Sequence, residues 1–237
     1  MKTLSNLFQT RSLVAGCLLI LFASLSFLLS GCAPNNLLTE TYTKDEPVKV
    51  HRIAVFPIQR VDPDEAVEGS LRCEICGTII TVGSTEPQAE KVVEEVVLQR
   101  IEKTGKFEIV PPERVQGMYQ RISAASLKSS LKDALVKSGR ELGADAILHG
   151  QVYRFRERIG YAYGADKAAS VAFALHLINA RDGSLIWKGR FDKTQTSLME
   201  NIFQASAFYK EKGRWLTARE LVDEGVSGML ETFPGAQ

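Results

Sequence analysis

An apolar run near the amino terminus decides how much of the chain is available to fold. Lys2 and Arg11 come first, the run extends from Leu13 to Leu29, and no acidic residue occurs before Glu40. A basic start, an apolar stretch and small residues at a cleavage point are typical of a secretory signal peptide. We therefore exclude residues 1–31 from the fold. The alternative is an uncleaved transmembrane anchor, because the run is nearly long enough to span a bilayer.

The signal ends in Leu29-Ser30-Gly31-Cys32, which resembles the lipobox of bacterial lipoproteins. The resemblance implies cleavage before Cys32, a diacylglycerol thioether on its sulfur, and acylation of its new amino group, for example by palmitate. Two or more acyl chains hold a protein stably at a membrane. Ala33 follows, rather than aspartate, which in Gram-negative lipoproteins implies the outer membrane. We expect an anchored protein that faces the periplasm, with a single-membrane source as the alternative.

The remaining chain, residues 32–237, is long enough for one domain with a hydrophobic core. Without Lys2 and Arg11, the 29 basic residues become 27, against 28 acidic residues. This balance argues against a nucleic-acid partner, because no basic excess neutralises phosphates. Residues 33–47 are polar and aperiodic, which predicts that residues 32–47 form the lipidated cysteine and a linker reaching at most about 50 Å. A single periplasmic domain with carboxy-terminal helices would then span residues 48–237.

The apolar pattern of that domain alternates between strand and helix periods. It predicts strands at 48–58, 107–110, 146–158, 169–180 and 185–193, and helices at 86–103, 113–121, 126–142, 198–210 and from Thr217 onward. Ser84 or Thr85 is the expected cap of the first helix, and Thr217 with Glu220 forms a capping box. We predict an α/β (α+β) fold with a mixed five-stranded sheet, element order β-α-β-α-α-β-β-β-α, and helices packed on the sheet.

Four segments resemble one group of bacterial envelope proteins. They are HRIAVFPI (51–58), KTGKFEIVPPERV (103–115), ELGADAILHGQVYRF (141–155) and HLINARDGSLIWKGRF (176–191). The group comprises the curli-export lipoproteins, the lipoprotein activators of penicillin-binding proteins and the amino-terminal domain of the Tol-system propeller protein. The resemblance covers roughly residues 48–193. It implies the fold and a non-enzymatic accessory or assembly factor that binds another envelope protein.

The chain departs from these relatives in two ways. The 160–167 connection and the 73–84 loop are too short for the membrane-spanning hairpins of a curli-export pore. The linker is too short for an activator that crosses the cell-wall layer. These departures favour a partner near the protein's own membrane, and membership of an oligomeric export complex, with homo-oligomers, remains a third hypothesis.

Cys73 and Cys76 form the sharpest local motif, Cys-Glu-Ile-Cys, within a long irregular segment from 59 to 84. In an oxidising compartment a local disulfide is the leading interpretation. A redox-active pair is an alternative, because this spacing lowers a thiol pKa. A zinc site is another, with His51, His149 or His176 as further ligands. We expect no other cofactor than the covalent lipid on Cys32.

The remaining candidates are weaker. His149 and His176 are expected level on neighbouring antiparallel strands, but a one-residue register decides whether they share a face. Arg154, Arg156 and Arg158 line one face of a strand and, with Trp215, are candidate partner contacts; a solvated face and core packing are the alternatives. No Gly-x-Ser-x-Gly, His-Glu-x-x-His or phosphate-binding loop occurs. We therefore predict that the protein is not an enzyme and has no catalytic residues.

Overall fold

The computed structural model describes residues 36–42, 49–125, 130–196 and 214–236. The signal segment, Cys32 and the helix expected at 198–210 lie outside these ranges. Within them, no helix combines the length and the apolar character that a membrane crossing requires.

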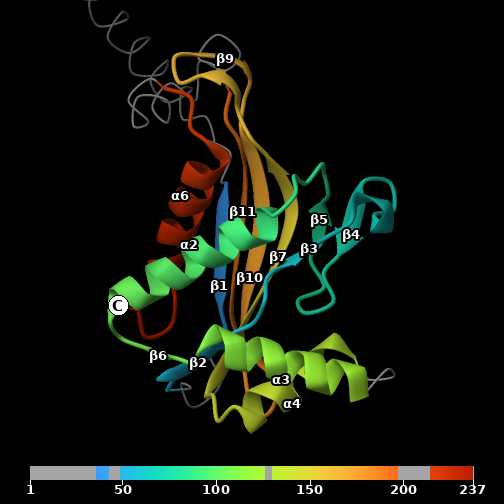
Figure 1. The fold of residues 1–237 in the computed structure, drawn as a ribbon, viewed down its shortest axis with the longest axis vertical. Coiled ribbons are helices and arrows are strands. Elements are labelled where there is room, and N and C mark those ends of the chain that lie inside the picture. Colours follow the sequence, from blue (N-terminus) through green and yellow to red (C-terminus); the bar gives the residue numbers. More distant parts are fainter. Residues whose placement is uncertain (1–35, 43–48, 126–129, 197–213, 237) are drawn as a thin grey trace, which may run out of the picture.

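A mixed sheet forms the centre of the fold (Figure 1). Its long antiparallel meander consists of β7 (Ala146–Arg156), β10 (Ser170–Asn179) and β11 (Leu185–Thr194). The short strands β2 (Arg52–Val55) and β3 (Gln59–Arg60) run parallel to β7, and β6 (Glu108–Ile109) runs parallel to β2. The predicted α+β class is confirmed, with seven strands in this sheet instead of five.

The extra edge strand corrects the predicted linker. β1 (Leu37–Thr41) pairs antiparallel with β11, so that Leu37 lies opposite Phe191 and Thr41 opposite Trp187. Leu37 packs on the core, and Glu40 forms an ion pair with Lys188 at 3.0 Å. An edge strand buries little of its side-chain surface and so needs few apolar residues. LLTET has only two, and its sequence pattern therefore resembles that of a linker. Residues 37–41 therefore belong to the folded domain.

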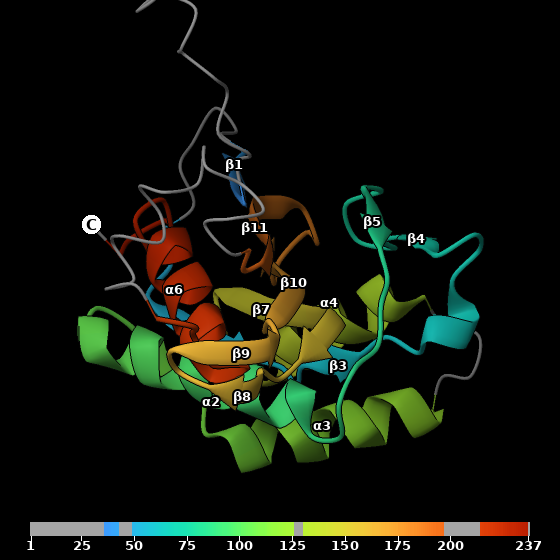
Figure 2. The same cartoon turned by 90° about the horizontal axis from the view of Figure 1, so that it is seen from above.

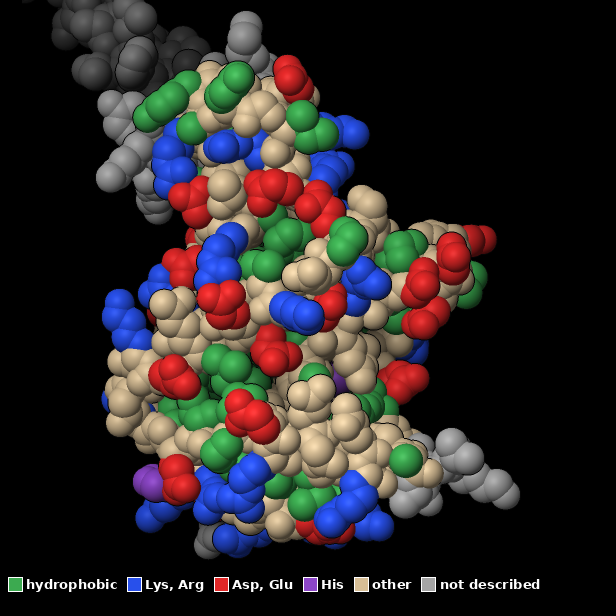
Figure 3. All heavy atoms as spheres, viewed as in Figure 1, with side chains coloured by type: hydrophobic (Ala, Val, Ile, Leu, Met, Phe, Trp, Pro, Cys, Tyr) green, Lys and Arg blue, Asp and Glu red, His purple; other side chains and the backbone are tan. Residues whose placement is uncertain are grey.

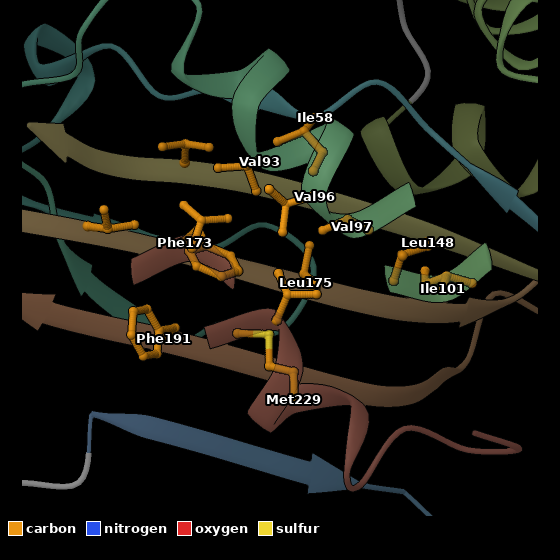
Figure 4. Packing of buried hydrophobic residues seen from close by; sticks show 14 of the residues in the cluster. Ile58, Val93, Val96, Val97, Ile101, Leu148, Phe173, Leu175, Phe191 and Met229 are labelled. Carbon is orange, nitrogen blue, oxygen red and sulfur yellow. The ribbon is translucent and has the colours of Figure 1, made fainter. Parts of the chain in front are cut away.

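Two helices cover one face of the sheet. α2 (Ala89–Thr104) and α6 (Ala218–Leu230) form one apolar cluster with the sheet. Val93, Val96, Val97 and Ile101 of α2 and Met229 of α6 are labelled in Figure 4. Leu221, Val222 and Val226 of α6 belong to the same cluster. The capping box of Thr217 and Glu220 is confirmed. The predicted cap at Ser84 or Thr85 is wrong, because α2 begins after Gln88, whose φ of 66° turns the chain without a side-chain cap.

The opposite face of the sheet is covered by α3 (Pro112–Ala125), α4 (Leu131–Glu141) and a β-hairpin. The two helices pack on Ala54, Ile147 and Ile178 at one end. Further along the strands, a short 3₁₀ helix (Pro63–Glu65) leads into the hairpin of β4 (Ser70–Arg72) and β5 (Ile79–Thr81). Cys73 and Ile80 of this hairpin pack on Tyr153, Ala172 and Ala174. Seen from above, the β4–β5 hairpin and α6 lie on opposite sides of the sheet (Figure 2).

A second hairpin, β8 (Ile159–Tyr161) with β9 (Gly164–Lys167), joins β7 to β10 and forms one tip of the molecule (Figure 1). The sequence predicted only a turn there. Tyr161 and Tyr163 at its apex are 84% and 81% exposed.

Candidate functional site

The turn of the β4–β5 hairpin brings Cys73 and Cys76 together. The Cys73 N–H donates to the Thr78 carbonyl at 2.9 Å, and the Gly77 N–H donates to the Cys73 carbonyl at 2.8 Å. Gly77 has a φ of 71°, which glycine adopts without steric cost. The Cys76 N–H then points at the Cys73 sulfur, 3.5 Å away. This backbone geometry holds two sulfur atoms on the same side of a tight turn.

β10 supplies a third chemical group to the cysteines. The Nε2 atom of His176 lies 3.5 Å from the Cys73 sulfur. One ligand atom from each of Cys73, Cys76 and His176 lies within 4.8 Å of the other two. Residues at least 100 positions apart in sequence therefore form one cluster, which we call the Cys–His cluster.

The histidine register left open by the sequence is settled. His176 pairs directly with His149 across β10 and β7, and the two rings stack with centroids 6.4 Å apart. Only His176 reaches the cysteines; His149 is not part of the Cys–His cluster, and His51 lies exposed before β2.

The Cys–His cluster is largely removed from solvent. Cys73 is 2% exposed and His176 is 1% exposed, whereas Cys76 is partly exposed. The Tyr153 hydroxyl donates to Gln151 Oε1 at 2.9 Å, and that oxygen lies 3.9 Å from the Cys73 sulfur. Among the described residues, Nδ1 of His176 has no hydrogen-bond partner. A buried polar atom without a partner costs about 1–3 kcal/mol, and this atom is on the side of the ring away from Nε2, which faces the Cys73 sulfur.

The two sulfur atoms are electrostatically different. Hydrogen bonding from Cys73, helped by His176 and Thr78, lowers the pKa of Cys76 to about 3. The same hydrogen bond, together with burial, raises the pKa of the Cys73 thiol. Burial lowers the pKa of His149 to about 3, so that its ring is neutral at physiological pH. The same contact therefore favours deprotonation of Cys76 over deprotonation of Cys73.

A small hollow meets the Cys–His cluster at Cys76. Its other walls are formed by β1, β5, β10 and β11, with Leu38, Thr78, Ile80, Ala174, Lys188, Gly189 and Arg190 as lining residues. The hollow has a volume of about 10 Å³, which is room for about one water molecule and no organic substrate. The arrangement suits binding of a small ion and does not suit turnover of a larger molecule.

The structure holds Cys73 and Cys76 as free thiols. The disulfide, the redox pair and the zinc site thus remain separate hypotheses for the same two residues. The sequence named both cysteines and His176, but not Thr78, Gln151 or Tyr153. The position of Thr78, two residues after Cys76, was one signal in the sequence. The alternation along β7, which places Gln151 and Tyr153 on one face of the strand, was another.

The arginines predicted as partner contacts are bound within the protein. Arg154 forms an ion pair with Asp192 and donates to the Ser170 hydroxyl at 2.7 Å. Arg156 donates to the Ala168 carbonyl, and Arg158 donates to the Trp215 carbonyl at 2.5 Å. The Trp215 N–H donates to the Ala162 carbonyl at 2.7 Å. These groups brace the β8–β9 hairpin, and their role in partner contact stays a prediction.

The fold is thus an α+β domain built on a mixed sheet, with a buried Cys–His cluster on one face. Residues 86–192 match the family described as peptidoglycan-synthase activator LpoB. The resemblance stated from the sequence is confirmed for that segment. The segment contains His149 and His176 but not Cys73 or Cys76, so the β4–β5 hairpin lies outside the matched region. No curated protein matches the chain.

Several solved structures align with much of this chain at low sequence identity. The PelC dodecamer from Paraburkholderia phytofirmans is 14% identical, with 82% of this chain and 94% of that chain covered and a TM-score of 0.44. The LpoB carboxy-terminal domain from Salmonella enterica is 15% identical, with coverage of 64% and 87% and a TM-score of 0.37. Lipoprotein GNA1162 from Neisseria meningitidis is 12% identical, with coverage of 68% and 96% and a TM-score of 0.39.

Proposed function

We propose that this protein is a non-enzymatic lipoprotein of the outer membrane that faces the periplasm and binds a peptidoglycan synthase, or an envelope protein associated with one, at a part of that partner that comes close to the outer membrane. The match of residues 86–192 to the peptidoglycan-synthase activator family carries this proposal. The lipobox at Cys32 supplies the anchor, and Ala33 after it supports the outer membrane.

The position of β1 limits where such a partner lies. Only three residues lie between Cys32 and Asn36, whose carbonyl accepts a hydrogen bond from the Asp192 N–H at 2.9 Å. The four steps along an extended chain from Cys32 to Asn36 reach at most about 14 Å. A lipid on Cys32 would hold the sheet against its own membrane, so the partner must come within reach of that surface.

Photo-crosslinking in intact cells tests the proposal. A photoreactive amino acid replaces Gln116 on α3 or Lys137 on α4, both exposed and inside the matched segment. The matched control carries it at Val67, which is 77% exposed and outside that segment. We expect crosslinks to a peptidoglycan synthase from the first two positions and not from the third. Crosslinks to no envelope protein from either helix would overturn the proposal.

A further inference from the structure

Cys73, Cys76 and His176 have the donor chemistry of a metal site. Two thiolate sulfurs and one imidazole nitrogen are the ligands that Zn²⁺ takes in proteins. Bond lengths of about 2.3 Å to sulfur and 2.0 Å to nitrogen, at a tetrahedral angle, place the two atoms about 3.5 Å apart. The distance from the Cys73 sulfur to Nε2 of His176 is 3.5 Å. The spacing is therefore the one that a shared zinc ion would require.

The local backbone is built for metal-bound thiolates. The Cys76 N–H points at the Cys73 sulfur, and the Cys76 thiol donates to the Thr78 hydroxyl oxygen at 3.3 Å. An N–H that points at a sulfur stabilises its deprotonated form, and a hydroxyl beside a sulfur can turn its own hydrogen toward a thiolate. They come from the turn itself, so they are present before β10 contributes its histidine. The hairpin thus supplies two ligands as a unit, and the sheet supplies the third.

The fourth position faces the small hollow. Its volume of about 10 Å³ admits one water molecule. Lys188 and Arg190 in the lining carry positive charge beside the anionic sulfurs. A larger ligand has no room, so an ion here would act on the structure by fixing the β4–β5 hairpin to β10.

We propose that Cys73, Cys76 and His176 bind one Zn²⁺ ion, with a water molecule in the hollow as the fourth ligand. The ion ties a hairpin outside the matched family segment to the central sheet. This proposal does not depend on the proposed function, because it concerns a ligand of the protein alone.

Metal analysis of the full-length protein, extracted from membranes in detergent, tests the site. We expect one zinc per chain and thiols that resist alkylation until a chelator is added. Cys76→Ser and His176→Asn should lower zinc affinity by at least about 100-fold, the upper end of what removal of a mere supporting residue costs. His149→Asn is the matched control, because His149 is equally buried and stacks on His176 without reaching the cysteines.

Cobalt keeps the test informative if a variant folds poorly. Co²⁺ added to the metal-free wild-type protein should give thiolate-to-cobalt charge-transfer absorption with a stoichiometry of one. A wild-type chain that carries a Cys73–Cys76 disulfide and no metal would overturn the proposal. Zinc retained by His176→Asn at wild-type affinity would overturn it as well.

A separate observation concerns the tip of the molecule. Ile159, Tyr161 and Tyr163 of the β8–β9 hairpin are 54%, 84% and 81% exposed. Figure 3 shows apolar side chains at this tip, with Lys and Arg side chains below them. Tyrosine is enriched where proteins meet the bilayer interface, because its ring is apolar and its hydroxyl remains hydrated.

The register of the sheet places this tip at the end of the sheet where β1 begins. Asn36 is hydrogen bonded to Asp192, which pairs with Ala172, which in turn pairs with Arg154. Tyr161 follows Arg154 by seven residues, which is at most about 23 Å along the strand. The four residues before Asn36 reach at most about 14 Å toward Cys32. This tether keeps the start of β1 within about 14 Å of the anchor, so the tip, which lies at the same end of the sheet, is on the membrane side of an anchored domain.

We infer that Ile159, Tyr161 and Tyr163 insert into the lipid headgroup layer and orient the domain on the membrane. The inference rests on the proposed lipidation of Cys32. The full-length lipidated protein is reconstituted in vesicles of phosphatidylethanolamine and phosphatidylglycerol that contain brominated lipid. Tryptophan fluorescence is measured for Tyr163→Trp and for the control Val67→Trp.

We expect bromine to quench the added tryptophan in Tyr163→Trp and to leave that in Val67→Trp unquenched. Equal quenching at both positions, or none at position 163 in protein that floats with the vesicles, would overturn the inference. Wild-type protein that does not float with the vesicles would instead overturn the lipidation, together with the orientation that depends on it.

Discussion

The β4–β5 and β8–β9 hairpins differ in what covers them. The β4–β5 hairpin lies flat on the sheet, with Ile80 and Cys73 each 2% exposed. The β8–β9 hairpin projects beyond the sheet with two exposed tyrosines at its apex. A hairpin of this length is marginally stable alone. One therefore depends on burial and on the Cys–His cluster, whereas the other depends on contacts at its base and leaves its apex for the surroundings.

The largest change in the free energy of unfolding is expected from a substitution that removes the packing of the β4–β5 hairpin on the sheet. Ile80→Ala should lower the free energy of unfolding by about 2–4 kcal/mol, because it removes a fully buried side chain. Ile79→Ala is the matched control, since Ile79 is adjacent and 61% exposed, and it should change stability by less than about 0.5 kcal/mol. Urea denaturation followed by circular dichroism measures both. Equal losses would mean that the hairpin does not dock as described.

Metal removal should affect the same hairpin next most strongly. If free zinc is held at 100 times its dissociation constant, chelation should lower the free energy of unfolding by about 2.7 kcal/mol. Proteolysis should then cut between the 3₁₀ helix and β5 before it cuts elsewhere. The β8–β9 hairpin, which lacks the Cys–His cluster, should show unchanged protection, and hydrogen exchange compares the two hairpins directly.

A smaller loss of stability is expected from a substitution among the residues that support the base of the β8–β9 hairpin. The Glu157 carboxylate accepts from the Ala218 N–H, and the adjoining Glu220 completes the capping box and binds Arg214. Glu220→Gln should lower stability by about 1 kcal/mol. The Arg214 hydrogen bond and the Thr217 N–H lower the pKa of Glu220 to about 2. Its stabilisation is thus complete above the ordinary glutamate pKa and is lost as the pH falls toward 2, and this acid-dependent loss should shrink in the variant.

The sequence predicted the parts of this comparison that depend on local patterns. Thr217 with Glu220 marked the start of α6 correctly, and the alternating residues of β7, β10 and β11 predicted the meander. Pairing between distant segments was not readable. β1 was missed because an edge strand needs few apolar residues, and its partner β11 lies about 150 positions away. His176 was one of three histidine candidates until the register placed it against Cys73.

The reactivity of Cys76 tests the β4–β5 hairpin without changing the stability of the protein. Because the pKa of Cys76 is lowered to about 3, its thiolate persists throughout the pH range above that value. In metal-free, reduced protein, iodoacetamide should modify Cys76 at a rate that hardly changes between about pH 5 and 8, whereas an ordinary thiol with a pKa of about 8.5 slows about tenfold per pH unit. Mass spectrometry of the digested protein identifies the modified cysteine. A rate that falls with pH like that of an ordinary thiol would mean that the turn does not stabilise the thiolate.

The smallest effect on stability belongs to the apex of the β8–β9 hairpin. Tyr161→Ser with Tyr163→Ser should leave the free energy of unfolding within about 0.5 kcal/mol of the wild type, because both side chains are more than 80% exposed. In the same variant the tip should no longer contact the membrane, although the lipid on Cys32 should still hold the protein on vesicles. A large loss of stability would show that the apex is part of the core, and the contrast between a buried and a projecting hairpin would then fail.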